Sequence, residues 1–348
     1  MMMEGVTLSG EAIQDLRRAI EAEDWVEAEQ PGRIEPRDAL TPYLERILGQ
    51  IRPARAMRVA VDAGNGVAGP VAVELLTRLG FEVEPLFCDV DGNFPNHHPD
   101  PSKPANLSDL VRRVTQGEAE IGLAFDGDGD RLGVVTKTGT VIYPDRLAML
   151  YARDILSRHP GAPIIYDVKC TRLLDPYIRA IGGQPVICRT GHSFVKAEMK
   201  DRGAPFAAEM SGHLFFNDER WMGFDDGVYV GVRLCEILSR EADPSAVLEA
   251  LPSAFNTPEL QIRMQEGEPH AFVKLAAERL PFDDAERVVK VDGLRVEWRD
   301  GFALVRASNT TPVLVLRFEG DSPEALERIR RRFVEALRSV KPDLAEPK

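Results

Sequence analysis

Apolar residues near the start of the chain recur three and four positions apart. Ile13, Leu16 and Ile20 share one side of this spacing and charged residues occupy the other side. The pattern predicts a helix over residues 10–23. The polar, proline-containing residues 27–36 that follow indicate a linker.

Short β-branched and apolar runs then alternate with helical spacings. The predicted strands cover residues 57–62, 81–87, 119–125, 163–168 and 185–188, and the predicted helices cover residues 38–50, 70–79 and 171–181. This alternation predicts α/β domains. Prolines in residues 91–104, DGNFPNHHPDPSKP, predict an irregular loop, and a second loop is expected over residues 190–193.

The last part of the chain has a different pattern, in which strands precede one long helix. The strands are predicted at residues 260–264, 288–291, 303–305 and 313–318. Ser322 is a suitable helix N-cap, and Pro323 suits the first helical position. The apolar positions of this helix are Leu326, Ile329, Phe333 and Leu337. We predict a small α+β domain here.

Composition narrows the class of protein. The 348 residues are 44% hydrophobic and 28% charged, with a formal net charge of −13, which is typical of a globular protein of more than one domain. This negative charge argues against nucleic-acid and membrane partners. An anionic substrate would therefore need a local cluster of cationic residues.

The cysteines and the N-terminus indicate a cytoplasmic protein. The four cysteines, Cys88, Cys170, Cys188 and Cys235, have neither C-x-x-C nor zinc-site spacing, so we expect reduced thiols. The first residues resemble no signal peptide, and no apolar run approaches the length of a membrane span.

The motif with the clearest chemistry is DGDGDR, which follows the strand predicted at 119–125. Asp126, Asp128 and Asp130 alternate with glycines, so three carboxylates can converge on one hard cation, Mg²⁺ or Ca²⁺. An EF-hand is excluded, because its sixth position would be Arg131 and its twelfth Lys137. The alternative is an acidic hairpin turn, which needs only one Asp-Gly pair.

Two further polar stretches could bind a ligand. EMSGH, residues 209–213, offers a carboxylate, a hydroxyl and an imidazole to a polyhydroxylated ligand. The alternative interpretation is an ordinary polar loop between two strands. RASNTTP, residues 306–312, combines a guanidinium with clustered hydroxyl and amide groups, as a phosphate site requires. An ordinary turn between strands is its alternative.

Basic residues follow two consecutive strands, with Lys169 and Arg172 after one and His192 and Lys196 after the next. In an open α/β sheet such strand ends face a common crevice. Solvated surface charge is the alternative for each of them.

Residues 64–69, GNGVAG, match the G-x-G-x-x-G pattern of a dinucleotide-binding turn, and Asp89 lies where a ribose-binding acid would. A nucleotide-dependent oxidoreductase is therefore a third hypothesis. It explains neither the three aspartates nor the RASNTTP stretch.

Taken together, these motifs resemble the α-D-phosphohexomutase superfamily, and within it the bacterial phosphomannomutase/phosphoglucomutase family. The matching stretches are VDAGNGVAGP, DGNFPNHHPDPSKPANL, GLAFDGDGDR, YPDRL, DVKCTR, TGHS, EMSGHLFF, GFDDG and RASNTTPVLVLRFE. The resemblance covers nearly the whole chain in order. Ala208 is a small departure, because the family commonly has glycine before the glutamate.

The resemblance implies a domain organisation. We expect two similar three-layer α/β mutase domains at residues 37–142 and 143–253, followed by an α+β phosphate-binding domain at residues 254–348. Residues 1–36 would be the last part of a further N-terminal α/β domain. The family implies a monomer.

The resemblance also implies roles for individual residues. The expected Mg²⁺ ligands are Asp126, Asp128 and Asp130, with Arg131 beside them. The expected sugar-binding residues are Glu209, Ser211 and His213, and the expected phosphate-binding residues are Arg306, Ser308, Asn309 and Thr310. Lys169 and His192 correspond to candidates for general acid and base.

The family reaction interconverts hexose 1-phosphate and hexose 6-phosphate of mannose and glucose through a 1,6-bisphosphorylated sugar, which also acts as an activator. It uses a phosphorylated serine in a Thr-Ala/Gly-Ser-His-Asn-Pro motif, and no serine of the printed sequence has that context. We therefore expect the chain to begin after this serine and its own turnover to be low. A non-catalytic protein that binds sugar phosphates is the alternative.

Overall fold

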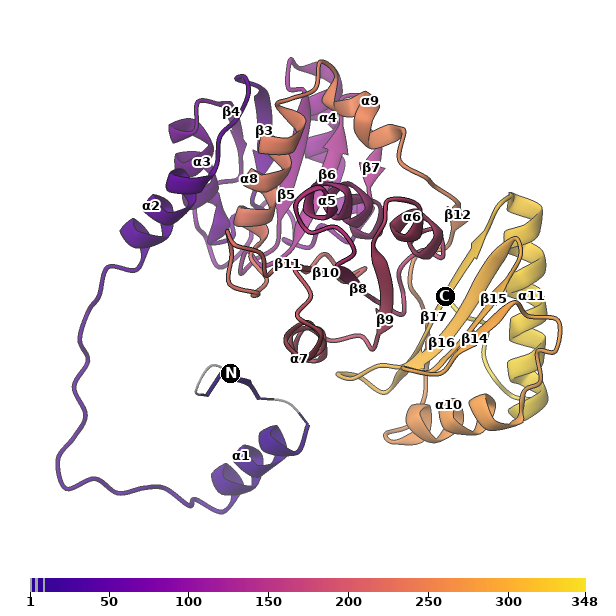
Figure 1. Cartoon of the computed structure of the whole chain (residues 1–348). Helices are drawn as coiled ribbons and strands as arrows, with labels where there is room; N and C mark the ends of the chain where they lie inside the picture. Colours follow the sequence, from indigo (N-terminus) through magenta and orange to yellow (C-terminus); the bar gives the residue numbers. More distant parts are fainter. Residues whose placement is uncertain (1, 4–5, 9) are drawn as a thin grey trace.

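The computed structural model describes residues 2–3, 6–8 and 10–348 (Figure 1). The first elements are β1 (Met2–Met3), β2 (Val6–Thr7) and α1 (Glu11–Glu21). Helix α1 confirms the helix predicted at residues 10–23, but it has no buried residue, and Ile20 on its apolar side is 58% exposed. An exposed linker, which leads away from α1 and back to α2, follows it (Figure 1).

The first α/β unit is built on a five-stranded sheet of order β4-β3-β5-β6-β7. Strand β3 pairs in parallel with β4 and β5, whereas β5–β6 and β6–β7 are antiparallel. Its strands are β3 (Arg58–Asp62), β4 (Glu82–Leu86), β5 (Ile121–Phe125), β6 (Leu132–Thr136) and β7 (Val141–Ile142).

Helices cover both faces of this sheet, because successive residues of a strand point to opposite sides. Val59 and Val61 share a core with α3, whereas Ala60 packs with α4. The helices from this part of the chain are α2 (Leu40–Gln50), α3 (Ala68–Arg78), the 3₁₀ helix η1 (Pro104–Leu107) and α4 (Ser108–Gln116).

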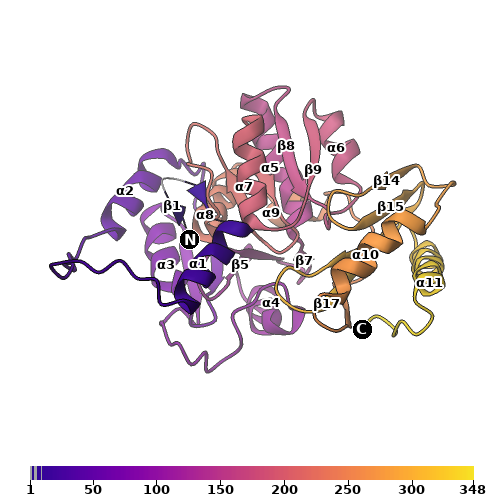
Figure 2. The same ribbon diagram turned by 90° about the horizontal axis from the view of Figure 1, so that it is seen from below.

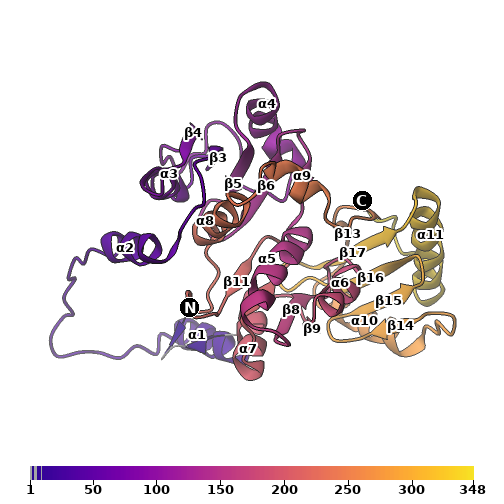
Figure 3. The ribbon, with the colours of Figure 1, turned by 45° about the horizontal axis from the view of Figure 1, so that its top comes forward.

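Two helices from much later in the chain also pack on this first sheet. Helix α8 (Gly227–Leu238) contacts α3, β5 and β6, and α9 (Pro244–Glu249) contacts β6 (Figures 1 and 3). Every residue of α8 is buried. The two α/β units are thus joined by shared helices as well as by the chain between them.

The second unit has a four-stranded sheet of order β11-β10-β8-β9. Its strands are β8 (Pro163–Asp167), β9 (Gln184–Cys188), β10 (Phe206–Ala208) and β11 (Leu214–Phe216). Its helices are α5 (Pro144–Arg158), α6 (Leu174–Ala180) and α7 (His192–Arg202). Strands β9, β8 and β10 are mutually parallel, so their carboxyl ends meet at one edge of the sheet.

The C-terminal unit is a six-stranded sheet in which β12-β17-β16-β15-β14 are neighbours and β13 also pairs with β17. The strands are β12 (Phe255–Asn256), β13 (Leu260–Arg263), β14 (Arg287–Val289), β15 (Leu294–Trp298), β16 (Gly301–Ala307) and β17 (Val313–Gly320). Its helices are α10 (Glu268–Arg279) and α11 (Pro323–Val340).

One face of this sheet packs on α10 and α11, and the other faces the second unit. Phe302 and Leu304 of β16 pack with Val168, which follows β8. The views of Figures 1 and 2 agree that the C-terminal unit lies beside the second α/β unit. Ser322 Oγ accepts a hydrogen bond from the Ala325 amide at 3.1 Å, which confirms the predicted N-cap of α11.

Some local expectations were wrong. Residues 190–193 are not all loop, since α7 begins at His192, directly after Gly191 at φ 129°. Helix α10 lies within a region for which only strands were predicted. In both helices few residues are buried, so the apolar pattern that marks a helix is weak.

Candidate active site

The three aspartates lie in the loop after β5. Asp126 is buried and Asp128 is exposed, and one carboxylate oxygen from each of Asp126, Asp128 and Asp130 lies within 4.8 Å of the others. Gly129, at φ 79°, allows the tight turn that brings them together. Three converging carboxylates are a donor set that suits a hard divalent cation.

The charges around this loop also favour the binding of a cation. Burial raises the pKa of Asp130 to about 7, and the charges of Asp126 and Asp128 add to the effect. Burial also opposes ionisation of Asp126, but Arg131, whose Nε lies 2.5 Å from Asp126 Oδ2, lowers its pKa. Arg131 therefore compensates Asp126, whereas the raised pKa of Asp130 shows that its negative charge lacks a comparable partner, as a carboxylate without its cation would.

The glycine-rich turn after β3 packs against the aspartate loop. A Cβ at Gly66 would lie 2.9 Å from the carbonyl oxygens of both Asp126 and Gly127. The amides of Asn65, Gly66 and Val67 donate to carbonyl oxygens of the chain. Because these amides are used internally, the turn does not offer them to a pyrophosphate. The close approach that needs glycine at position 66 is to the aspartate loop.

The EMSGH stretch forms the turn between β10 and β11. Glu209 is buried, and its Oε1 accepts a hydrogen bond from the Gly191 amide at 2.6 Å. Ser211 is half-buried in the same turn. A backbone bridge pairs His213 with Arg131, so this turn lies directly beside the aspartate loop.

Asp225, just before α8, joins these loops and was not singled out from the sequence. Its Oδ2 lies 3.1 Å from His213 Nδ1, and its Oδ1 accepts from Lys196 Nζ at 2.9 Å. His213 Nδ1 is also 3.6 Å from Asp130 Oδ1. The sequence signal was GFDDG, a pair of acids between glycines.

The RASNTTP stretch forms the turn between β16 and β17. Arg306 is buried, its Nε lies 2.9 Å from Asp292 Oδ2, and its second terminal nitrogen has no hydrogen-bond partner. Ser308 Oγ is 3.2 Å from Thr311 Oγ1. The exposed Asn309 and Thr310 complete a group of short polar side chains at one turn.

This turn is tied to the loop after β9 by two residues. Asp292 Oδ2 accepts from the Thr190 amide at 3.0 Å, and Asn309 Nδ2 donates to the Thr190 carbonyl at 3.3 Å. The next residue, Gly191, donates to Glu209. The expected phosphate-binding and sugar-binding residues are therefore connected through residues 190–191.

The basic residues at the strand ends have different surroundings. Lys169 is buried, with Nζ 2.6 Å from Glu259 Oε1, and Arg172 pairs with Asp321 of the C-terminal unit. His192 is exposed at the first position of α7, with its ring 6.0 Å from that of His213. Arg172 therefore joins two units and does not face the crevice.

Comparison with known proteins identifies the chain. Family models for the α/β/α domains II and III and the C-terminal domain of phosphoglucomutase/phosphomannomutase match residues 41–139, 143–255 and 259–336. The chain belongs to the phosphoglucomutase/phosphomannomutase family. The expected superfamily and fold class are confirmed, and the enzymes of this family are isomerases.

Relatives from three bacteria are similar over nearly the whole chain. It is 54% identical to a phosphoglucomutase of Neisseria gonorrhoeae, over 97% of this chain and 74% of that protein. It is 51% identical to a phosphomannomutase/phosphoglucomutase of Pseudomonas aeruginosa, over 100% of this chain and 74% of that protein. A crystal structure of a family protein from Burkholderia thailandensis superposes with a TM-score of 0.93 at 53% identity, over 99% of this chain and 73% of that one.

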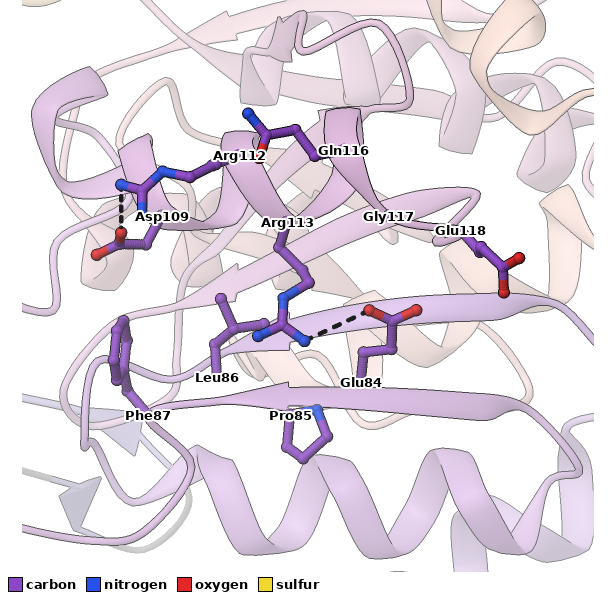
Figure 4. Close-up of a pocket in the computed structure, with 10 residues that line it drawn as sticks. All are labelled: Glu84, Pro85, Leu86, Phe87, Asp109, Arg112, Arg113, Gln116, Gly117 and Glu118. Carbon is purple, nitrogen blue, oxygen red and sulfur yellow. Dashed lines mark ion pairs between the residues drawn. The ribbon is translucent and has the colours of Figure 1, made fainter.

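Two hollows of this phosphohexomutase differ in chemistry. A cavity of about 290 Å³ lies between the three units and is lined by Arg131, Lys169, Ser211 and Glu259 among others. A larger hollow of about 710 Å³ is lined by residues of β4 and α4 and includes none of the candidate-site residues (Figure 4). Its arginines are paired with its own acids, Arg112 with Asp109 and Arg113 with Glu84, so it offers no unpaired cation.

Phosphohexomutases generally use Mg²⁺, and the aspartate loop is the matching group of acids. Among the described residues, no helix is both long enough and apolar enough to span a membrane.

Proposed function

We propose that the chain binds hexose phosphates and supplies three domains of a mutase that interconverts the 1-phosphates and 6-phosphates of mannose and glucose. The observation that supports this most is the connection of two turns through the loop after β9. Asp292 and Asn309 contact Thr190, and Gly191 contacts Glu209. This connection supports the proposal, because a sugar phosphate needs its phosphate-binding residues and its hydroxyl-binding carboxylate close together.

Each of the two turns would bind one part of the sugar phosphate. Arg306, which is buried with one terminal nitrogen unpaired, would bind the phosphate, together with Ser308, Asn309 and Thr310. Glu209 and Ser211 would bind sugar hydroxyls. The phosphate that does not react is thus kept at the C-terminal domain while the other end of the sugar points toward the aspartate loop.

The two candidate proton-transfer residues suit opposite roles. The exposed His192 is partly desolvated by the surrounding protein, and this effect and the nearby Lys196 lower its pKa, which favours a neutral imidazole that can accept a proton. Burial opposes the charge of Lys169, but Asp167 and Glu259 raise its pKa, so it remains an ammonium that can donate. We propose His192 as base and Lys169 as acid or as an electrostatic partner of the reacting hydroxyl.

The aspartate loop would hold the cation. Asp126, Asp128 and Asp130 provide the oxygen ligands, and Arg131 neutralises part of their charge. A bound Mg²⁺ would supply neutralisation of charge on phosphoryl oxygens. His213, fixed by Asp225, would orient the sugar side of this loop.

The reaction we propose is the one that the family resemblance implies. A phosphorylated serine gives its phosphoryl group to the free hydroxyl of the hexose phosphate, whose proton goes to the base. The 1,6-bisphosphorylated sugar then turns around and returns its other phosphoryl group to the serine. The printed residues contain no such serine motif, so we propose that this 348-residue polypeptide on its own binds the sugar phosphate but turns over slowly.

Calorimetry with glucose 1-phosphate and mannose 1-phosphate on the purified chain tests the binding proposal. Saturable binding of both sugar phosphates, with weaker binding of free glucose, would support it. Equal affinity for glucose and glucose 1-phosphate would contradict it, because no phosphate site would then contribute. NAD(H) titration tests the oxidoreductase hypothesis, which the use of the GNGVAG amides within the chain already disfavours.

A further inference from the structure

Asp292 lies in the turn between β14 and β15, in contact with the buried arginine of the RASNTTP stretch. We propose that Asp292 is a positioning residue, which orients the guanidinium of Arg306 so that its unpaired terminal nitrogen can contact the phosphate of the sugar. The inference rests on the proposed function, because Arg306 is proposed there as a phosphate-binding residue.

The backbone next to Asp292 approaches Arg306 closely. Leu294 of β15 pairs with Val305 of β16, so the turn before Leu294 lies beside Arg306. Gly293 has a φ of 94°, and a Cβ at this position would lie 2.3 Å from the Val305 carbonyl oxygen and 2.9 Å from Arg306 Cα. Glycine is therefore required directly after Asp292 for the turn to pass this close to Arg306.

The carboxylate of Asp292 contacts one nitrogen of the guanidinium and leaves another unpaired. Asp292 Oδ2 accepts from Arg306 Nε at 2.9 Å, and the two side chains are 13% and 5% exposed. Arg306 Nη2 is buried and has no hydrogen-bond partner among the described residues. A buried donor without a partner is costly, so an acceptor from a ligand would be favoured there. Because the guanidinium is planar and rigid, a contact that fixes Nε also fixes the direction in which the terminal nitrogens point.

A second donor holds the same carboxylate oxygen from the neighbouring unit. The Thr190 amide donates to Asp292 Oδ2 at 3.0 Å, and Thr190 Oγ1 donates to Asp167 Oδ2 at 2.8 Å. The Thr190 carbonyl accepts from Asn309 Nδ2 at 3.3 Å. Asp292 is thus held by a residue that is itself fixed, and it can serve as the stationary end of its contact with Arg306.

Charge alone makes the opposite prediction about Asp292. A carboxylate close to a phosphate site repels the phosphate, so removal of a carboxylate that acts only through its charge would tighten phosphate binding. If Asp292 orients Arg306, its removal frees the guanidinium and weakens binding in spite of the lost repulsion. The sign of the change in affinity therefore separates the two explanations.

The experiment is a double-mutant cycle on glucose 1-phosphate affinity, measured by calorimetry on the full chain. The variants are Asp292→Ala, Arg306→Met and the double variant. We expect Asp292→Ala to weaken binding about tenfold alone, as the loss of a charged hydrogen bond would, and less than about twofold in the Arg306→Met background. Asp292→Asn keeps an oxygen acceptor for Arg306 Nε but loses the charge, and it should weaken binding by only about threefold.

The control is Asp300→Ala, which removes another aspartate of the same unit that pairs with an arginine. Asp300 directly precedes β16, at the end of the strand opposite Arg306, and accepts from Arg328. This change should leave the affinity for glucose 1-phosphate unaltered. Tighter binding by Asp292→Ala or Asp292→Asn would overturn the inference. An equal loss in the wild-type and Arg306→Met backgrounds would also overturn it, and would assign the effect of Asp292 to its contact with Thr190.

Crystal structures of the ligand-free wild type and Asp292→Ala provide a readout that needs no sugar phosphate. We expect the Arg306 guanidinium of the variant to leave its wild-type position while the backbone of β16 stays in place. A guanidinium that keeps its position would overturn the inference. Failure of the wild-type chain to bind glucose 1-phosphate would instead contradict the proposed function, while the crystal structures would still decide whether Asp292 holds Arg306.

Discussion

His213 and Asp225 form an ion pair, with Nδ1 of the imidazole 3.1 Å from Oδ2 of the carboxylate. The pair joins the turn after β10 to the residues just before α8, and Asp225 also accepts from Lys196. Burial opposes ionisation of Asp225, but His213 and Lys196 hold its pKa well below its usual range. Asp225 is therefore an ionised residue between the ammonium of Lys196 and the imidazole of His213 at the edge of the candidate site.

Asp225→Asn should destabilise the protein more than Lys196→Met. The first change leaves both Lys196 and His213 without their carboxylate, whereas the second leaves Asp225 paired with His213. We expect Asp225→Asn to cost about 2 kcal/mol, the range for a charged hydrogen bond, measured as a shift in denaturant midpoint. Equal losses for the two variants would show that His213 contributes nothing to the pair.

Asp128→Asn should weaken Mg²⁺ binding at least tenfold in calorimetry. The side chain is exposed, so its replacement removes a ligand oxygen without disturbing packing. The matched control is Asp201→Asn, an exposed acid at the end of α7. Unchanged Mg²⁺ affinity in Asp128→Asn would contradict the metal assignment.

Glu209→Gln should stabilise the chain in a way that depends on pH. The pKa of Glu209 is raised from 4.5 to about 7, so the folded state retains a proton that the unfolded state has lost in this window. The contribution of Glu209 to stability therefore falls as the pH rises from about 4.5 to about 7.

At pH 8, without sugar or Mg²⁺, we expect Glu209→Gln to be more stable than wild type by about 2 kcal/mol. Near pH 4.5 the two proteins should melt together. Thermal melts across this range measure the difference, and Glu278→Gln, an exposed change on α10, serves as control. A constant difference at all pH values would mean that burial of the Glu209 charge is not its cause.

Arg306→Lys should weaken glucose 1-phosphate and mannose 1-phosphate to the same extent, by about tenfold. Lysine keeps the positive charge but lacks the planar pair of N–H donors of the guanidinium. Its single ammonium cannot contact both Asp292 and a phosphate as the guanidinium can. Arg331→Lys on the exposed side of α11 is the control. A loss confined to one of the two sugars would place Arg306 near a sugar hydroxyl.

The 348-residue polypeptide should show little interconversion of glucose 1-phosphate and glucose 6-phosphate in a coupled assay. Positioning of a phosphoryl donor can contribute roughly 7–11 kcal/mol to barrier lowering, and the printed residues hold no serine motif to serve as donor. Glucose 1,6-bisphosphate should not restore activity, whereas addition of the N-terminal domain of a family relative should. Turnover of about one per second or faster by the polypeptide alone would contradict this prediction.

The local sequence pattern was enough to predict the strands that precede the candidate site residues. The strand before Asp126 and the N-cap at Ser322 follow from short apolar runs and single turn residues, and both are present. The family was identifiable for the same reason, because its motifs are contiguous stretches. Helix α7 was harder to predict, because only two of its residues are buried and they form no clear apolar stripe.

Tertiary structure alone decided which distant residues meet. The sequence does not indicate that α8 packs on the first sheet, that the GNGVAG turn contacts the aspartate loop, or that Asp225, Asp292 and Glu259 each pair with a basic candidate residue. Each of these contacts joins positions far apart along the chain. Periodicity and turn chemistry report only on neighbours within a few residues, whereas these pairs depend on how whole sheets and helices pack.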